Sequence, residues 1–332
     1  MLAVIVAALG VGIYLATRAS AGPSHHAAQG GGPGRATPAA TTPSPTPPAP
    51  HPAGSLGDYR VAQRLFTFTK RAGGALGNRV LHVAVRYPIT ALGQASGTAG
   101  TNSFPLIVFA PGYRQCSAAY GALLQQWASA GYVVAGVNFP RTNCHVANPD
   151  ESDLVNQPGD LAFVIRQVKL LSSTPHGQLA GLVNPARVAI AGQSDGGDTV
   201  AAMTAMSCCQ YPGLRATVVL AGAEWPAFAG KWFSAPTAPM LFVQGTADLI
   251  NPPAASLQLY QSDTTGARYY LQLTGADHLT PYEGTRAPEP IVARVTIDFL
   301  DHYLAGEGTI GAMRSAGRVA GVSELAGGGQ LP

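Results

Sequence analysis

The sequence predicts an α/β protein with a mostly parallel central sheet, antiparallel strands at its start, and helices on both faces. After the antiparallel start, short apolar strand segments alternate with segments of helical apolar spacing, an order that requires right-handed crossovers. The run Pro105–Ala110 (PLIVFA) is apolar throughout, as expected for a strand buried on both faces. Only the 19 residues 221–239 separate two expected strands, so we expect no large cap domain.

The first expected elements are the strands Val61–Thr69 and Arg79–Tyr87, which the turn-rich segment 73–78 joins as an antiparallel pair. The strands expected after them are Pro105–Ala110, Tyr132–Val137, Val188–Ala191, Thr217–Leu220, Met240–Val243 and Tyr269–Leu273. The expected helices are Ser117–Ala130, Gly159–Leu171, Gly196–Met206, Ala254–Gln261 and Pro290–Leu304. In sheets of this kind the functional side chains lie in loops at the carboxyl ends of the strands.

The overall composition excludes several classes of protein. Of the 332 residues, 46% are hydrophobic and only 11% are charged, against a usual charged share of about 25%. The net charge of +3 comes without any run of Lys or Arg, which argues against nucleic acid as a partner. Four cysteines are too few for a fold built on disulfides.

The two ends of the chain differ in composition from its middle. Residues 1–16 are almost all apolar and precede Ala19-Ser20-Ala21, so residues 1–21 are expected to be a signal peptide or signal anchor. The Pro-, Gly- and Ala-rich residues 22–54 have no apolar periodicity and are expected to form a disordered linker. We expect a catalytic domain over residues 55–310 and a flexible tail over 311–332. The protein is then secreted or membrane-anchored, with a possible tether through its first segment, and monomeric.

An exported location permits disulfides. Cys116 and Cys144 each follow an expected strand and can meet at one edge of the sheet, so this pairing is our first choice among the three possible. A bridge between the adjacent Cys208 and Cys209 would be strained and uncommon. We expect no metal site, because no CxxC or HxxxH spacing occurs.

The segment Gly192-Gln193-Ser194-Asp195-Gly196-Gly197 follows an expected strand and begins an expected helix. It has the Gly-x-Ser-x-Gly pattern in the strand–turn–helix setting of a nucleophile elbow. Glycines are needed there because a Cβ would clash with the neighbouring strand and helix. The turn lifts the Ser194 hydroxyl clear of the sheet, next to the free N–H groups of the helix. We therefore expect Ser194 to be a nucleophile rather than an idle serine in a Gly-rich turn.

A serine hydroxyl needs an adjacent base. His278 lies in the loop after the last expected strand, where the chain order of nucleophile, acid and base places it. Asp248 follows Met240–Val243 and is our choice for the acid that orients the imidazole. Glu224 is the rival acid, and Asp277 is expected to point elsewhere.

An oxyanion hole needs two donors aimed at one oxygen. One is expected to be the backbone N–H of Asp195, which follows the nucleophile, and the other the N–H of Tyr113 in the loop after Pro105–Ala110. Gly112 allows the close backbone approach that this loop requires. The Tyr113 ring can also form a wall of the substrate pocket.

Together, Pro105–Asn138, the GQSDGG elbow, Gly245–Asp248 and Asp277-His278 resemble the α/β-hydrolase superfamily. They are similar to the secreted bacterial cutinases and polyester hydrolases, and to dienelactone-hydrolase-like and platelet-activating-factor-acetylhydrolase-like esterases. The resemblance covers roughly residues 60–305. It implies an oxyanion donor and aromatic wall at Tyr113, and a substrate-binding Trp at Trp225.

The elbow departs from this family on both sides of the nucleophile. The family commonly has His before it and Met after it, where this chain has Gln193 and Asp195. A carboxylate at Asp195 would weaken oxyanion stabilisation unless it were paired, and Arg114 is a candidate partner. The alternative is that Asp195 caps N–H groups of the helix.

We expect a serine esterase that cleaves small or polymeric esters in an open site through an acyl-enzyme, without metal or organic cofactor. Phe228, Trp232 and Phe233 either form an apolar rim near Trp225 or pack as core. A peptidase or amidase and a lipid acetylhydrolase are alternatives on the same fold. An inactive exported binding protein is the alternative from another class.

Overall fold

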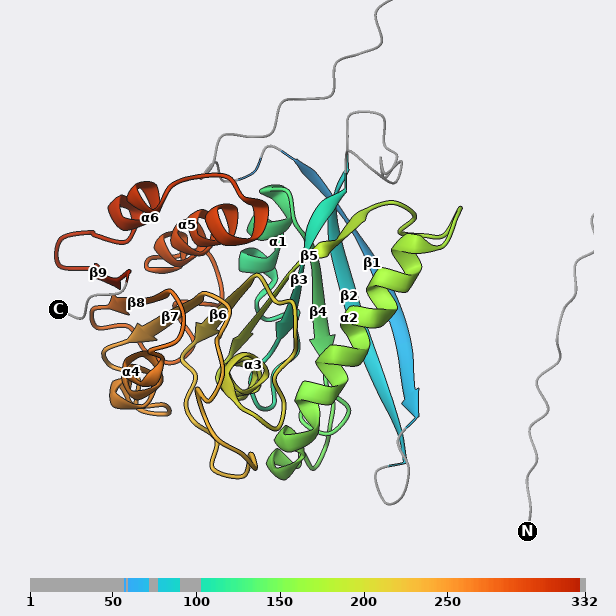
Figure 1. Ribbon diagram of the computed structural model, residues 1–332, viewed down its shortest axis with the longest axis horizontal. Helices are drawn as coiled ribbons and strands as arrows, with labels where there is room; N and C mark the ends of the chain where they lie inside the picture. The colour runs from blue at the N-terminus through green and yellow to red at the C-terminus, as the bar shows by residue number, and fades with distance from the viewer. Residues whose placement is uncertain (1–56, 58, 72–76, 90–102, 329–332) are drawn as a thin grey trace, which may run out of the picture. The chain divides into compact units, whose positions relative to one another are not determined.

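A nine-stranded sheet forms the centre of the computed structural model, which describes residues 57, 59–71, 77–89 and 103–328 (Figure 1). Its strand order is β1-β2-β4-β3-β5-β6-β7-β8-β9. The strands from β4 to β8 in this order run parallel, whereas β1, β2 and β9 are antiparallel to their neighbours. The strands are β1 (Arg60–Arg71), β2 (Asn78–Ile89), β3 (Phe104–Ala110), β4 (Val133–Asn138), β5 (Val183–Gln193), β6 (Ala216–Leu220), β7 (Met240–Gly245), β8 (Arg268–Leu273) and β9 (Ser323–Gly327).

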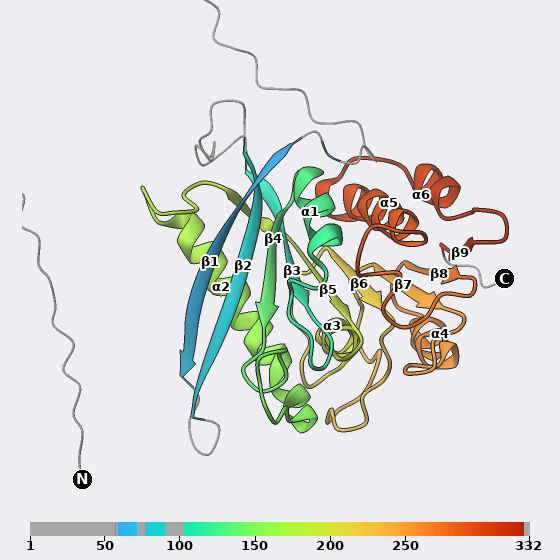
Figure 2. The same ribbon diagram turned by 180° about the vertical axis from the view of Figure 1, so that it is seen from behind.

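Helices cover both faces of the sheet, as Figures 1 and 2 show from opposite sides. One apolar core lies between the sheet and α1, α5 and α6, and a second lies between the sheet and α2, α3 and α4. The parallel strands are buried along almost their whole length because both of their faces contact helices. The helices are α1 (Gly121–Ser129), α2 (Gln157–Ser173), α3 (Asp195–Ala205), α4 (Pro253–Ser262), α5 (Glu289–Leu300) and α6 (Ile310–Ala316).

The structure confirms the predicted fold class: a mostly parallel sheet, antiparallel N-terminal strands, helices on both faces and no large cap domain. All eight expected strands and all five expected helices are present, with ends that differ by a few residues. Between β6 and β7 the chain contains no helix, and only an isolated bridge from Met206 to Trp232 interrupts its irregular path.

Three short elements near the site and the C-terminus were not expected. A 3-10 helix, Glu151–Asn156, precedes α2 and contacts α3. The expectation of a flexible tail over 311–332 is wrong for residues 311–328, which form most of α6 and all of β9. Met313 and Leu325 are buried there, and the Arg314 guanidinium donates to the Gly327 carbonyl at 2.6 Å. Two apolar anchors twelve residues apart produce no periodic pattern that sequence reasoning can detect.

The expected signal segment and linker, residues 1–54, lie outside the described residues. None of the helices in the described ranges is long and apolar enough to cross a bilayer.

Candidate active site

Ser194 lies in a sharp turn between the end of β5 and the start of α3. Its backbone angles are φ 55° and ψ −125°, in the left-handed region that a side chain adopts only under strain. A Cβ at Gly192 would overlap the Gly196 carbonyl, and a Cβ at Gly196 would overlap the carbonyl oxygen of Ala110 in β3. The two glycines therefore allow the backbone to form this turn directly against β3.

The structure brings Ser194, His278 and Asp248 together from the ends of three parallel strands. Nε2 of His278 lies 2.9 Å from Oγ of Ser194, and Nδ1 lies 2.7 Å from Oδ2 of Asp248. All three residues are buried. The carboxylate on Nδ1 favours the tautomer that carries its proton on Nδ1, which leaves Nε2 free to accept the serine proton.

The Asp248 carboxylate is held from both sides. Its Oδ1 accepts the backbone N–H groups of Ile250 and Asn251, each at 2.9 Å. Its Oδ2 accepts the side-chain amide of Gln244 at 2.9 Å in addition to the His278 ring. Four donors thus fix the orientation of this acid.

The two other candidate acids are placed differently. Asp277 turns back on its own loop, where its carboxylate accepts the N–H groups of Leu279 and Thr280. Those bonds, with the Thr280 N–H as the largest cause, lower the pKa of Asp277. In the part of the chain that the structure describes, Glu224 makes no hydrogen bond or ion pair with His278.

The loop after β3 packs directly on the elbow. A Cβ at Gly112 would lie 3.1 Å from the Ser194 Cβ and 2.7 Å from Oε1 of Gln193, so only glycine fits without displacing the elbow. The Gly112 N–H is already occupied, since it donates to the Tyr120 hydroxyl at 3.3 Å. Within the described ranges the N–H groups of Tyr113 and Asp195 donate to no backbone carbonyl.

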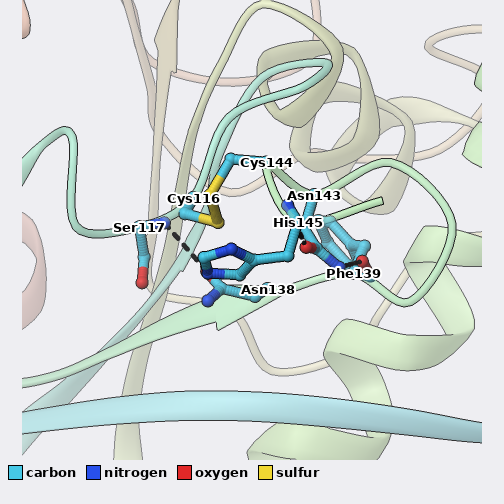
Figure 3. Close-up of a disulfide and its surroundings, with 7 residues drawn as sticks. All are labelled: Cys116, Ser117, Asn138, Phe139, Asn143, Cys144 and His145. Atoms are coloured by element: carbon cyan, nitrogen blue, oxygen red, sulfur yellow. Dashed lines mark hydrogen bonds between the residues drawn. A yellow bond between two sulfur atoms is a disulfide. The ribbon is translucent and has the colours of Figure 1, made fainter. Parts of the chain in front are cut away.

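The same loop is tied to residues 142–149, which follow β4. Cys116 and Cys144 form a disulfide, as predicted (Figure 3). In addition, the Arg114 N–H donates to the Thr142 carbonyl at 2.7 Å, and the Tyr113 hydroxyl donates to the Pro149 carbonyl at 2.9 Å. These crosslinks stabilise Arg114 in the left-handed region, at φ 61°.

Figure 3 also shows the His145 side chain close to this disulfide. The ligand atoms of Cys116, Cys144 and His145 lie within 4.8 Å of one another. Both sulfurs are joined to each other and so are not available as thiolate ligands. The adjacent Cys208 and Cys209 are also joined, which is the bridge we expected to be uncommon.

Asp195 is buried beside the nucleophile, and none of the described residues supplies it with a countercharge. The residue is 6% exposed, and its Oδ2 has no hydrogen-bond partner among the described residues. Burial, together with the charge of Glu151, raises the pKa of Asp195 to about 7, against a small opposing effect of its own N–H. Burial also raises the pKa of the nearby Asp198.

The expected partner of Asp195 is not there. The Arg114 guanidinium lies 5.7 Å from the centroid of the Tyr113 ring, and no ion pair in the described part of the chain joins it to Asp195. The alternative of helix capping is not observed either, because no hydrogen bond from another helix N–H to the Asp195 carboxylate is present in that part.

Trp225 lies in the segment between β6 and β7 and packs against a small apolar cluster of Leu154, Ala202, Met206 and Phe228. It is half-buried, and its buried indole Nε1 has no hydrogen-bond partner in the part of the chain that the structure describes. Phe228 belongs to that cluster, and Trp232 and Phe233 pack against the core beside α3, so these three side chains pack as core. The substrate-binding role of Trp225 stays a prediction.

Two buried polar residues of the site were missed by sequence reasoning. Gln193 bonds to His278 through its amide nitrogen, and its Oε1 accepts the Tyr120 hydroxyl at 2.7 Å. Gln193 stands next to the nucleophile, and its departure from the family pattern was the signal available. Tyr120 carries no comparable signal, because it directly precedes α1 and lies 73 residues before Gln193 in the sequence.

Comparisons with known proteins agree with this geometry. A family model described as PET hydrolase-like matches residues 84–310, a segment that contains all three members of the Ser194, His278 and Asp248 group. The chain is similar to Cutinase 1 of Thermobifida cellulosilytica, at 25% identity over 206 residues that span 61% of this chain and 70% of that protein. It is also similar to Cutinase of Thermobifida fusca (strain YX), at 25% identity over 206 residues that span 61% of this chain and 60% of that protein.

Proposed function

Because the chain belongs to the PET hydrolase-like family and is a carboxylic ester hydrolase, we propose that it cleaves esters with Ser194 as nucleophile. His278 is the general base, and Asp248 orients it and stabilises the imidazolium. The observation that carries this proposal is the continuous hydrogen-bonded chain from Ser194 Oγ through both ring nitrogens of His278 to Asp248. It lies at the carboxyl ends of β5, β7 and β8, the edge of the sheet where α/β folds place their chemistry.

In the first half of the reaction, Ser194 Oγ attacks the ester carbonyl carbon while its proton moves to Nε2 of His278. The tetrahedral intermediate collapses when the bond to the leaving alcohol breaks, and that alcohol takes the proton from Nε2. The product is an acyl-enzyme ester on Ser194. Water then attacks this ester with His278 as base, and the carboxylic acid leaves as the serine regains its proton.

The negative oxygen of both tetrahedral intermediates is stabilised by the N–H groups of Tyr113 and Asp195. Gly112 packs on Ser194, which brings this loop next to the nucleophile. The Gly112 N–H already donates to the Tyr120 hydroxyl, which leaves the next N–H, that of Tyr113, as the donor. The second donor, the N–H of Asp195, lies at the start of α3. Such donors are worth several kcal/mol because they point at charge that develops only in the transition state.

We infer that the substrates are apolar esters, including esters of a polymer surface. Leu249 and Ile250 directly follow the acid of the site and are 93% and 66% exposed. The Ile250 N–H is bonded to Asp248, so the loop that carries both apolar side chains is fixed to the site. The family description and the names of the cutinase relatives support the same substrate class.

We also infer an extracytoplasmic location. The two disulfides are consistent with it, because cytosolic proteins rarely keep such bonds. The expected signal segment agrees with export. Within that location we propose that the catalytic domain acts as a monomer on its ester substrate.

The test of the catalytic assignment is hydrolysis of p-nitrophenyl acetate and butyrate by the wild type, Ser194→Ala and Ser173→Ala. Ser173 lies at the exposed end of α2 and provides a matched control. We expect Ser194→Ala to lose activity and labelling by a fluorophosphonate probe, while Ser173→Ala keeps both. Unchanged turnover in Ser194→Ala would overturn the assignment.

The substrate class is tested separately, with a chain-length series of p-nitrophenyl esters, a p-nitroanilide and a solid polyester film. We expect ester cleavage to exceed anilide cleavage, and Leu249→Ser/Ile250→Ser to lose more activity on the film than on soluble acetate. Equal losses on both substrates would contradict the role of these two side chains in surface contact.

A further inference from the structure

We propose that Gln193 and Tyr120 form a buried polar relay, which positions the base His278 relative to the loop after β3. Both are positioning residues, since they contact other residues of the site and act through them. This inference rests on the proposed function, because His278 and the loop after β3 are the parts that the relay connects. It gives a role to Gln193, one of the two residues at which the elbow departs from the family pattern.

The relay joins three loops that come from distant parts of the chain. The Gln193 amide nitrogen donates to the His278 carbonyl at 3.0 Å and lies 3.3 Å from its Nε2. The Tyr120 hydroxyl donates to Gln193 Oε1 at 2.7 Å and accepts the Gly112 N–H at 3.3 Å. Gln193 and Tyr120 are completely buried, so water does not compete for these bonds.

The two ends of the relay determine how the Gln193 amide is oriented. The His278 carbonyl oxygen only accepts, so it requires the nitrogen of the amide on its side. The Tyr120 oxygen already accepts a bond from Gly112, so its own proton is directed to Oε1 of Gln193. A flipped amide would place two oxygens against each other at His278. One orientation therefore satisfies the bonds at the His278 carbonyl, at Gln193 Oε1 and at the Tyr120 oxygen together.

This orientation also affects the position of the base. The Gln193 amide nitrogen lies 3.3 Å from Nε2, the ring atom that faces Ser194 Oγ, so Gln193 restricts the rotation of the imidazole. The bond from the same amide to the His278 carbonyl fixes the loop. The charged groups that also act on His278 are Asp248, Asp277 and Glu283.

The relay is tested with Gln193→Met, which keeps the length of the side chain but has neither donor nor acceptor. We expect kcat/KM for p-nitrophenyl butyrate to fall by about three- to tenfold, the range of one net hydrogen bond. We expect this loss to fall on kcat and to leave KM unchanged, because Gln193 positions the base and does not contact substrate. A side chain that only packed beneath the substrate site would not separate kcat from KM in this way.

Tyr120→Phe and the double variant test whether the two residues act as one unit. We expect the double variant to be no worse than Gln193→Met alone, because the Tyr120 effect passes through Gln193. Tyr269→Phe is the matched control: it removes a buried hydroxyl paired with Tyr303 at the opposite end of β8, and we expect it to leave kcat/KM and its pH profile unchanged.

The outcomes separate the relay from the proposed function. The relay would be overturned, and the ester hydrolase left in place, by a Gln193→Met variant whose kcat equals that of an active wild type while Ser194→Ala is inactive. Additive losses in the double variant would also overturn it. An inactive wild type would overturn both proposals. If Gln193→Met does not fold, Gln193→Glu carries the test, since it keeps the acceptor for Tyr120, loses the donor to the His278 carbonyl and is expected to lower kcat with KM unchanged.

Discussion

Replacing Asp195 by Asn is expected to stabilise the protein at neutral and alkaline pH. Burial, with a contribution from Glu151, raises the pKa of Asp195 from 3.8 to about 7. Between these two values the folded state holds a proton that the unfolded state has lost, so the free energy of unfolding decreases as pH rises through this window. At about 1.36 kcal/mol per pH unit, the difference of about three units between the two pKa values lowers the free energy of unfolding by about 4 kcal/mol above pH 7.

The amide that Asp195→Asn introduces cannot ionise, and the variant therefore escapes this cost. We expect Asp195→Asn to exceed the wild type by up to about 4 kcal/mol at pH 8 and to match it near pH 4. The measurement is urea denaturation at pH 4, 6 and 8, with equal m values as the check that both proteins unfold alike. Burial also raises the pKa of Asp198, on which the charge of Asp195 acts, so the transition observed belongs to these two acids together.

Asp277→Asn provides a control of opposite sign. Hydrogen bonds from Thr280 and Leu279 lower the pKa of Asp277, so its stabilising effect is present above its unfolded pKa and lost as pH falls. We expect this variant to be less stable than wild type at pH 7 and equal to it in acid. A stability difference for Asp195→Asn that is the same at every pH would refute the reasoning about its buried carboxyl.

The same ionisation predicts a change in catalysis. Above pH 7 the wild type acquires a negative charge on the residue whose N–H is assigned to the oxyanion, and this charge opposes the one that develops on the substrate. We expect kcat of the wild type to fall relative to Asp195→Asn as pH rises from 6 to 9. Parallel profiles would show that the carboxylate does not act on the oxyanion.

Three further experiments test other parts of the site. Asp248→Asn is expected to lower kcat by roughly 10⁴-fold, because the imidazole loses the partner that selects its correct tautomer. Glu224 is the rival acid, and Glu224→Gln is expected to keep activity. The reverse result would exchange the roles of the two acids. Replacing both Cys116 and Cys144 by Ser should lower the free energy of unfolding by about 3 to 4 kcal/mol, as expected for a disulfide that closes a 28-residue separation. The measurement is urea denaturation, and an unchanged midpoint would contradict this expectation. Gly196→Ala should yield no active protein, because its Cβ overlaps the Ala110 carbonyl, and normal activity would show that the elbow can relax.

Much of the architecture could be predicted because its signals are local. Continuous apolar runs such as 105–110 identify strands buried on both faces, and helical spacing identifies the segments between them. The elbow is also local, since its glycines and serine must follow one another. From the chain order alone, His278 and Asp248 were then assigned to loops that the structure brings against Ser194.

Other features depend on contacts between distant residues, which leave no pattern along the chain. Tyr120 meets Gln193 across 73 residues, and Met313 and Leu325 anchor an end of the chain that lacks periodicity. Composition indicated that Asp195 is unusual in its place, but neither its lack of a countercharge nor its raised pKa follows from its neighbours in sequence.

The sequence by itself determined the order of strands and helices, the Ser-containing turn and the chain order of the candidate nucleophile, acid and base. Only the tertiary structure decided which buried polar groups satisfy one another around them. The physical reason is that strand and helix formation depend on apolar spacing over a few residues, whereas hydrogen bonding and desolvation of a side chain depend on whatever the fold packs beside it.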